Sequence, residues 1–141
     1  MKKILVINGP NLNLLGLREP DIYGTQSYSS LLEFIEDAAG NAGIEVRCFQ
    51  SNSEGAIVDE IQQAYGRFDG IIINPAAYTH TSIAILDALK AVGIPAVEVH
   101  LSNIMDREAF RQTSYTALAC DKTFYGMGFE GYAEAIRYFA P

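Results

Sequence analysis

Several kinds of enzyme leave short signatures that this chain of 141 residues lacks. It has no Gly-x-x-x-x-Gly-Lys-Ser/Thr run and no Gly-x-Gly-x-x-Gly run, so a P-loop or dinucleotide-binding enzyme is not expected. Its cysteines and histidines do not have the spacing of zinc ligands. The chemistry of this chain is therefore expected to proceed without a metal and without a cofactor.

Lysine is scarce, and this limits the covalent chemistry open to the chain. The lysines are Lys2, Lys3, Lys90 and Lys122. None of them lies in the polar segments that follow the first, third and fourth predicted strands. A catalytic lysine that forms a Schiff base with a carbonyl substrate is therefore not expected.

Basic charge and long apolar runs are also missing. The formal net charge is −7, whereas nucleic acids and anionic membranes are bound by basic surfaces. There is no run of 18 apolar residues to span a membrane, and the apolar stretch 4–7 is too short for a signal peptide. Cys48 and Cys120 are interpreted as reduced thiols. We expect a cytoplasmic protein that binds neither nucleic acid nor membrane.

Short apolar runs alternate with longer amphipathic segments along the sequence. Strands are predicted at 3–8, 45–49, 70–74, 96–99 and 119–124, and helices at 29–42, 55–66, 81–92, 103–113 and 131–139. Ser29 is the predicted cap of the first helix. Strands that are apolar on both faces are typical of a parallel sheet covered by helices. The sequence predicts a single catalytic domain over 1–141 of the α/β class, with a flavodoxin-like, doubly wound, five-stranded parallel sheet and helices on both faces.

Polar residues gather after the first, third and fourth predicted strands, where ligands bind in folds of this kind. The two histidines, His80 and His100, fall at the carboxyl ends of neighbouring strands, which favours a functional role for both. FMN binding would require a Ser/Thr-rich loop after the first strand, but residues 9–13 there contain neither serine nor threonine, so FMN binding is not expected. A phospho-accepting receiver domain would require an aspartate where this chain has Asn74.

Glu98 precedes His100 by two residues, so both side chains point to the same side of their strand. A carboxylate near an imidazole fixes its tautomer and holds its proton, which suits a general acid near neutral pH. The alternative interpretation is an ion pair at the end of the strand without a chemical role.

Three further segments are candidate parts of a site. A helix beginning near Ser102 would offer backbone N–H groups to a carboxylate, with Arg111 as a bidentate partner. Residues 79–81 either cap the next helix or contact a ligand, and the two roles are compatible. Arg18 and Tyr23 lie in a stretch that is either a lid over the site or an ordinary surface loop. Together the residues indicate a cofactor-free acid–base enzyme that acts on a small hydroxylated carboxylate.

The sequence closely resembles the type II 3-dehydroquinate dehydratases over essentially its whole length. The sharpest matches are the runs 8–16, 18–20, 23–24, 74–75, 78–82 and 98–103. The resemblance implies an anti dehydration of 3-dehydroquinate to 3-dehydroshikimate through an enolate, in the shikimate pathway of aromatic amino acid biosynthesis or in quinate catabolism.

The resemblance also implies a role for each matched site residue. Tyr23 removes a proton from the carbon next to the ketone, and Arg18 favours the phenolate of that tyrosine. Asn11 belongs to the network that stabilises the enolate. His100 protonates the departing hydroxyl with Glu98 as its partner.

Substrate binding and assembly are implied in the same way. The residues that match the family's substrate-binding positions are Asn74, His80, Asp87 and Arg111, with the backbone of Leu101 and Ser102 holding the carboxylate. The counterpart of Asp87 reaches a neighbouring subunit's site, so we expect a homo-oligomer, a dodecamer built as a tetramer of trimers.

The chain departs from the family pattern at a few positions. It has Gln112 and Thr113 where two histidines are common, Leu86 where an arginine is common, and Ser53 where a histidine is common. Leu86 is expected to weaken the subunit contact that presents Asp87. The alternative interpretation of the whole chain is a catalytically weak relative that serves as a ligand-binding or structural oligomer.

Overall fold

The computed structural model describes residues 1–17 and 26–141. Five parallel strands form one sheet in the order β2-β1-β3-β4-β5. They are β1 (Lys3–Asn8), β2 (Glu45–Gln50), β3 (Gly70–Asn74), β4 (Ala96–His100) and β5 (Lys122–Tyr125). This is the strand order of flavodoxin-like folds, so the predicted fold class is confirmed.

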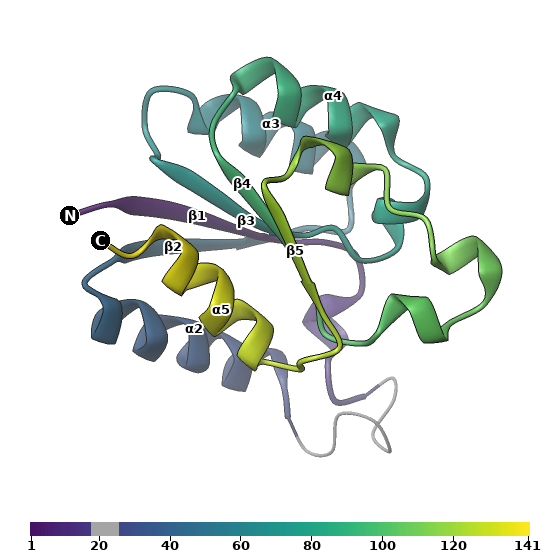
Figure 1. Ribbon diagram of the computed structural model, residues 1–141, viewed down its shortest axis with the longest axis horizontal. Helices are drawn as coiled ribbons and strands as arrows, with labels where there is room; N and C mark the ends of the chain where they lie inside the picture. Colours follow the sequence, from purple (N-terminus) through teal and green to yellow (C-terminus); the bar gives the residue numbers. More distant parts are fainter. Residues whose placement is uncertain (18–25) are drawn as a thin grey trace.

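Helices cover both faces of the sheet (Figure 1). Helices α2 (Tyr28–Ala42) and α5 (Glu130–Phe139) pack on one face, and α3 (Glu54–Ala64) and α4 (Ile83–Val92) pack on the other. Alternate residues of β1 enter the two cores, with Ile4 and Val6 on the side of α2 and α5 and Leu5 and Ile7 on the opposite side. No helix within residues 1–17 and 26–141 is long and apolar enough to cross a membrane.

Serine side chains cap three of the helices. Ser27, Ser53 and Ser82 each accept a hydrogen bond from the backbone N–H three residues later. The predicted cap at Ser29 is wrong, because Ser29 already lies inside α2. The cap Ser27 has extended backbone, as a residue just outside a helix requires.

The helix predicted at 103–113 is also wrong. That segment contains only two 3-10 turns, η3 (Ile104–Asp106) and η4 (Ala109–Arg111). The Asn103 side chain accepts from the Met105 N–H and donates to Asp106, which competes with helical hydrogen bonding. Arg107 then has extended backbone, which ends the first turn.

A further 3-10 turn, η5 (Thr116–Ala119), ends at the first residue of the predicted last strand, and β5 begins only at Lys122. The segment between β4 and β5 is therefore irregular, and it runs beside the carboxyl ends of the strands (Figure 1). The structure thus places this irregular segment, together with the turns after β1 and β3, at the edge of the sheet where a site was predicted.

Candidate active site

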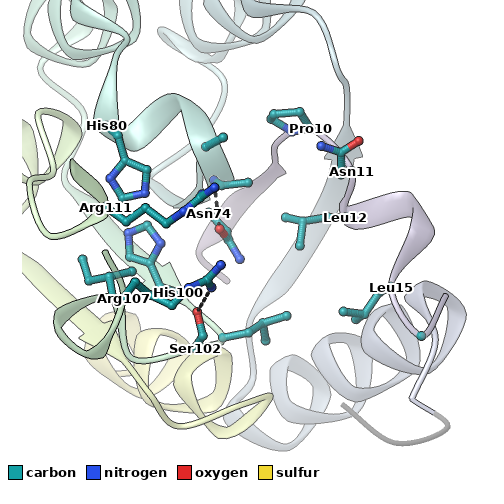
Figure 2. A pocket seen from close by; sticks show the side chains of 15 residues that line it. Pro10, Asn11, Leu12, Leu15, Asn74, His80, His100, Ser102, Arg107 and Arg111 are labelled. Carbon is teal, nitrogen blue, oxygen red and sulfur yellow. Dashed lines mark hydrogen bonds between the residues drawn. The ribbon is translucent and has the colours of Figure 1, made fainter. Parts of the chain in front are cut away.

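A cavity of about 300 Å³ opens beyond the carboxyl ends of β1, β3 and β4. It lies where the strand order reverses, which is the usual ligand site of a doubly wound sheet. Figure 2 shows Pro10, Asn11, Leu12 and Leu15 on one side and His80, His100, Arg107 and Arg111 on the other. The remaining lining residues are Gly16, Asn74, Ala76, Ala77, Leu101, Ser102 and Ile104.

A buried hydrogen-bond network fixes the amide of Asn74 in the wall of this cavity. Asn74 Nδ2 donates to the Tyr132 hydroxyl at 3.0 Å, and that hydroxyl donates to Asn8 Oδ1 at 2.6 Å. Asn74 Oδ1 accepts from the Ala76 N–H at 3.1 Å. Because both ends of the amide are held, its remaining N–H is the group that Asn74 can offer to a ligand.

The turns after β1 and β3 approach each other closely under the cavity. The Gly9 N–H donates to the Asn74 carbonyl at 2.8 Å. A Cβ at position 9 would lie 2.4 Å from the Pro75 carbonyl oxygen, so only glycine fits there. Asn11 has left-handed backbone and its N–H is held by Asn52 at 2.9 Å. These contacts fix the position of Asn11 against the third strand.

The two histidines are held by different partners. His80 Nδ1 lies 2.8 Å from the Thr113 carbonyl oxygen, and since a carbonyl only accepts, Nδ1 carries the hydrogen. Nε2 of His80 is thus the ring nitrogen left for a ligand. His100 Nε2 lies 3.0 Å from Glu98 Oε2, with the carboxylate fully buried and the imidazole 5% exposed. Nδ1 of His100 is therefore the ring nitrogen left for the cavity.

The contact between His100 and Glu98 is short but is not an aligned hydrogen bond. Among the described residues Nε2 has no partner that meets hydrogen-bond geometry, although its distance to the carboxylate is short. A small rotation of the ring would align the Nε2–H with the carboxylate, and when the imidazole is protonated its attraction to a carboxylate at 3.0 Å depends only weakly on that alignment.

Glu98 is ionised despite its burial. Burial alone would raise the pKa of its carboxyl group, but the His100 imidazole and the hydroxyls of Thr116 and Ser114 hold that pKa below its ordinary value.

The cavity favours an anion although the whole chain is acidic. Arg107 and Arg111 line it, whereas no aspartate or glutamate among the described residues does. Arg107 Nη1 donates to the Ser102 hydroxyl at 3.3 Å. Arg111 uses only Nε to pair with the exposed Glu108, so the rest of its guanidinium is available for a second carboxylate.

The structure brings most of the predicted site residues together. Those lining the cavity are Asn11, Asn74, His80, His100, Leu101, Ser102 and Arg111, and Glu98 lies directly behind His100. Asp87 is on the exposed side of α4 and does not line this cavity. Arg18 and Tyr23 lie outside the described residues. The proposed helix amino end at Ser102 is wrong, because η3 is a single turn.

Two cavity features were not assigned from the sequence. Arg107 lines the cavity, and its spacing of four residues to Arg111 was the available signal. Tyr132 was missed, since no local pattern links it to Asn74 or to Asn8, which is 124 positions away.

The departures from the family pattern have identifiable roles in this structure. Ser53 caps α3, and Gln112 Nε2 donates to the Arg107 carbonyl at 3.0 Å. Thr113 holds His80 through its backbone oxygen, so its side chain is free to vary. Leu86 is 6% exposed and belongs to the buried face of α4.

Comparison with known proteins agrees with the chemistry that the site residues indicate. A family model described as Dehydroquinase class II matches residues 2–140. A 3-dehydroquinate dehydratase of Clostridium acetobutylicum is 56% identical over 134 residues, which cover 95% of this chain and 93% of the relative. One of Clostridium perfringens is 57% identical over 136 residues, covering 96% of this chain and 94% of that protein.

Solved structures give the same result. The crystal structure of a type II dehydroquinase from Butyrivibrio crossotus superposes with a TM-score of 0.94 at 52% identity, covering 97% of this chain and 96% of that one. The type II dehydroquinase from Propionibacterium acnes superposes with a TM-score of 0.93 at 41% identity, covering 98% and 95%.

Proposed function

We propose a mechanism for this chain, which belongs to the class II dehydroquinase family and catalyses the dehydration of 3-dehydroquinate. The proposal is an anti elimination through an enolate, in which a base on one side of the ring and an acid on the other act in turn. The observation that carries it is the position of His100, which lines the cavity with a buried carboxylate 3.0 Å behind it.

His100 acts as the general acid in this proposal. Its Nε2 is turned toward Glu98, so the proton must leave from Nδ1, on the cavity side of the ring. Transfer of that proton to the departing hydroxyl releases water and leaves the double bond of 3-dehydroshikimate. Glu98 stabilises the imidazolium before the transfer and orients the ring throughout.

Tyr23 acts as the base, with Arg18 favouring its phenolate. Both residues lie outside the described part of the structure, so this assignment rests on the match of the run 18–24 to the family pattern. The phenolate removes a proton from the carbon next to the ketone, and the negative charge moves to the ketone oxygen as an enolate. Asn11 lies on the cavity wall across from the histidines and is proposed to stabilise that charge through an ordered water (Figure 2).

The carboxylate of the substrate is proposed to bind at Arg111 and the backbone of Leu101 and Ser102, which lie together on one side of the cavity. Asn74 and His80 are proposed to bind ring hydroxyls, because each presents a hydrogen-bonding atom that its own contacts leave free. This arrangement would hold the ring against the acid, His100.

The reaction is proposed to proceed without an imine. The ketone could form one only with a lysine, and Lys2, Lys3, Lys90 and Lys122 are all absent from the cavity lining. An enolate stabilised by hydrogen bonds then replaces the electron sink that an imine would supply.

We also propose that the chain works as a homo-oligomer, a dodecamer built from trimers, and in the cytoplasm. Asp87 is exposed on α4 and away from its own cavity, which suits a residue that reaches the cavity of a neighbouring subunit. Both cysteines are free thiols, as in a reducing compartment. The whole chain is proposed to be one catalytic domain in the shikimate pathway or in quinate catabolism.

The test of the proposed base compares tyrosine variants. Tyr23→Phe should reduce kcat by at least about a thousandfold, as loss of a general base does at the strong end of its range, while dehydroquinate binding persists. Tyr65→Phe, at a position 71% exposed, should keep wild-type kinetics. Near-normal turnover by Tyr23→Phe would remove Tyr23 as the base.

A further inference from the structure

The carboxylate of Glu98 is enclosed by hydroxyl groups rather than by cations. It is fully buried in β4, and its only ion-pair partner among the described residues is His100. The other titratable group that faces it is the thiol of Cys120, next to β5, whose pKa burial and then the Glu98 charge raise. A buried anion with one weak cation needs several further donors to remain charged.

Three hydroxyls supply these donors. Thr79 Oγ1 donates to Glu98 Oε1 at 3.1 Å, Ser114 Oγ lies 2.8 Å from Oε2, and Thr116 Oγ1 makes a short contact with Oε1. We refer to Thr79, Ser114 and Thr116 as the hydroxyl cage. Thr79 and Thr116 are fully buried, so water cannot replace them.

The cage is built from two segments that the chain brings together beside β4. Thr79 belongs to η2 (Ala76–His80), whereas Ser114 and Thr116 belong to the segment leading into η5. The segments are joined by the Tyr115 N–H, which donates to the Thr79 carbonyl at 2.8 Å, and Ser114 Oγ also accepts from the Ala117 N–H. These bonds fix the hydroxyls independently of any ligand.

We propose that Thr79, Ser114 and Thr116 are positioning residues that keep Glu98 ionised and thereby keep the catalytic proton on His100. This inference rests on the proposed role of His100 as the general acid. An ionised carboxylate only accepts hydrogen bonds, so each hydroxyl can direct its one hydrogen toward it, either directly or through a neighbouring hydroxyl, since Thr79 Oγ1 lies 2.5 Å from Ser114 Oγ and 2.7 Å from Thr116 Oγ1. A protonated carboxyl would compete as a donor and leave the cage with fewer acceptors.

The cage, Glu98 and His100 therefore have separate roles in the proposed acid step. The cage determines the charge of Glu98, Glu98 holds the imidazolium through Nε2, and Nδ1 delivers the proton in the cavity. Removing one cage hydroxyl should therefore change the pH range in which the enzyme works. It should have little effect on how strongly substrate binds, because none of the three residues lines the cavity.

The test is the pH dependence of kcat for Thr116→Val, which removes a hydroxyl with little change of shape. Protonation of Glu98 removes the charge that holds the imidazolium of His100, and this contributes an acidic limb to the profile. We expect this acidic limb to move to higher pH by about one unit, the size of shift that loss of one hydrogen bond to a carboxylate can produce. KM should stay within about twofold of wild type, and Thr116→Ser should restore the limb.

Two further variants make the result decisive. Thr123→Val is the matched control, since Thr123 on β5 is the register partner of Glu98 but makes no hydrogen bond to it. It should leave the limb in place. Ser114→Ala, at a less buried cage position, should shift the limb in the same direction and serves if Thr116→Val does not fold.

An unmoved acidic limb in folded Thr116→Val and Ser114→Ala would overturn the inference, whether activity is unchanged or is reduced equally at every pH. His100→Asn separates this failure from failure of the underlying mechanism. If His100→Asn turns over at a near-wild-type rate, His100 is not the acid and the proposed function itself is contradicted at that residue.

Discussion

The buried tyrosine of α5 offers the sharpest test of how the sheet edge is organised. Tyr132 is fully buried, and its hydroxyl accepts from Asn74 and donates to Asn8. Tyr132→Phe keeps the ring and removes only this oxygen. It would leave Asn8 Oδ1 without a donor and one N–H of Asn74 without an acceptor.

The magnitude follows from the burial of these two amides. An unsatisfied buried polar group costs about 1–3 kcal/mol. The full cost applies to Asn8, which is fully buried. Asn74 borders the cavity and can turn toward water. We therefore expect Tyr132→Phe to lower the free energy of unfolding by about 1–3 kcal/mol. Because Asn74 is then free to turn, KM for dehydroquinate should rise about tenfold, which corresponds to about 1.4 kcal/mol.

The assay is urea unfolding at one fixed protein concentration, since assembly would make stability concentration-dependent. Tyr138→Phe is the matched control on the same helix, because the Tyr138 hydroxyl donates to Asp121 at a position that is 42% exposed. This control should cost less than about 1 kcal/mol. If Tyr132→Phe is no more destabilising than Tyr138→Phe and leaves KM unchanged, the network does not position Asn74.

Three other perturbations probe the burial, packing and charge described above. Gly9→Ala should destabilise the fold by about 1–3 kcal/mol, because its Cβ meets the Pro75 carbonyl. Gly40→Ala, with open space around it in α2, should stabilise the fold by up to about 1 kcal/mol. Equal effects of the two variants in urea unfolding would contradict the close approach of Gly9 to Pro75. The pKa of each cysteine is raised from 9.0 to about 12, chiefly by burial. At pH 8 a thiol reagent should therefore modify the native protein far more slowly than the protein unfolded in urea. Similar rates of modification would refute the protection of the thiols by burial. The pKa of Glu98 is lower in the folded protein, so the unfolded chain binds the proton more readily. The contribution of the Glu98 carboxylate to stability is therefore complete above about pH 4.5 and is lost as the pH falls below that value. The difference in unfolding free energy between wild type and Glu98→Gln should narrow on acidification, and a constant difference would contradict an ionised Glu98.

Local sequence patterns predicted the sheet well because its signals are local. The strand Ile71-Ile72-Ile73 is apolar on both faces, and Gly43 and Gly93 end their helices in left-handed conformation as glycine permits. The pairing of Glu98 with His100 also follows from the period of two in a strand. Each of these features is determined by residues that are close in the sequence.

The segment between β4 and β5 could not be predicted in the same way. Its composition fits a helix, but the Asn103 side chain competes for the backbone and the chain adopts short turns instead. The hydroxyl cage and the contact of Tyr132 with Asn8 join residues far apart in the sequence. Such contacts depend on tertiary packing, and no spacing in the sequence indicates them.

The most direct test of an imine-free acid–base elimination is product formation after borohydride treatment. The purified protein is incubated with 3-dehydroquinate and borohydride, the reductant is removed, and the ultraviolet absorbance of the conjugated product is followed with fresh substrate. The account predicts an unchanged rate, because no lysine lines the cavity to be trapped as a reduced imine. Inactivation that requires both substrate and borohydride, with substrate bound covalently to a lysine, would contradict it.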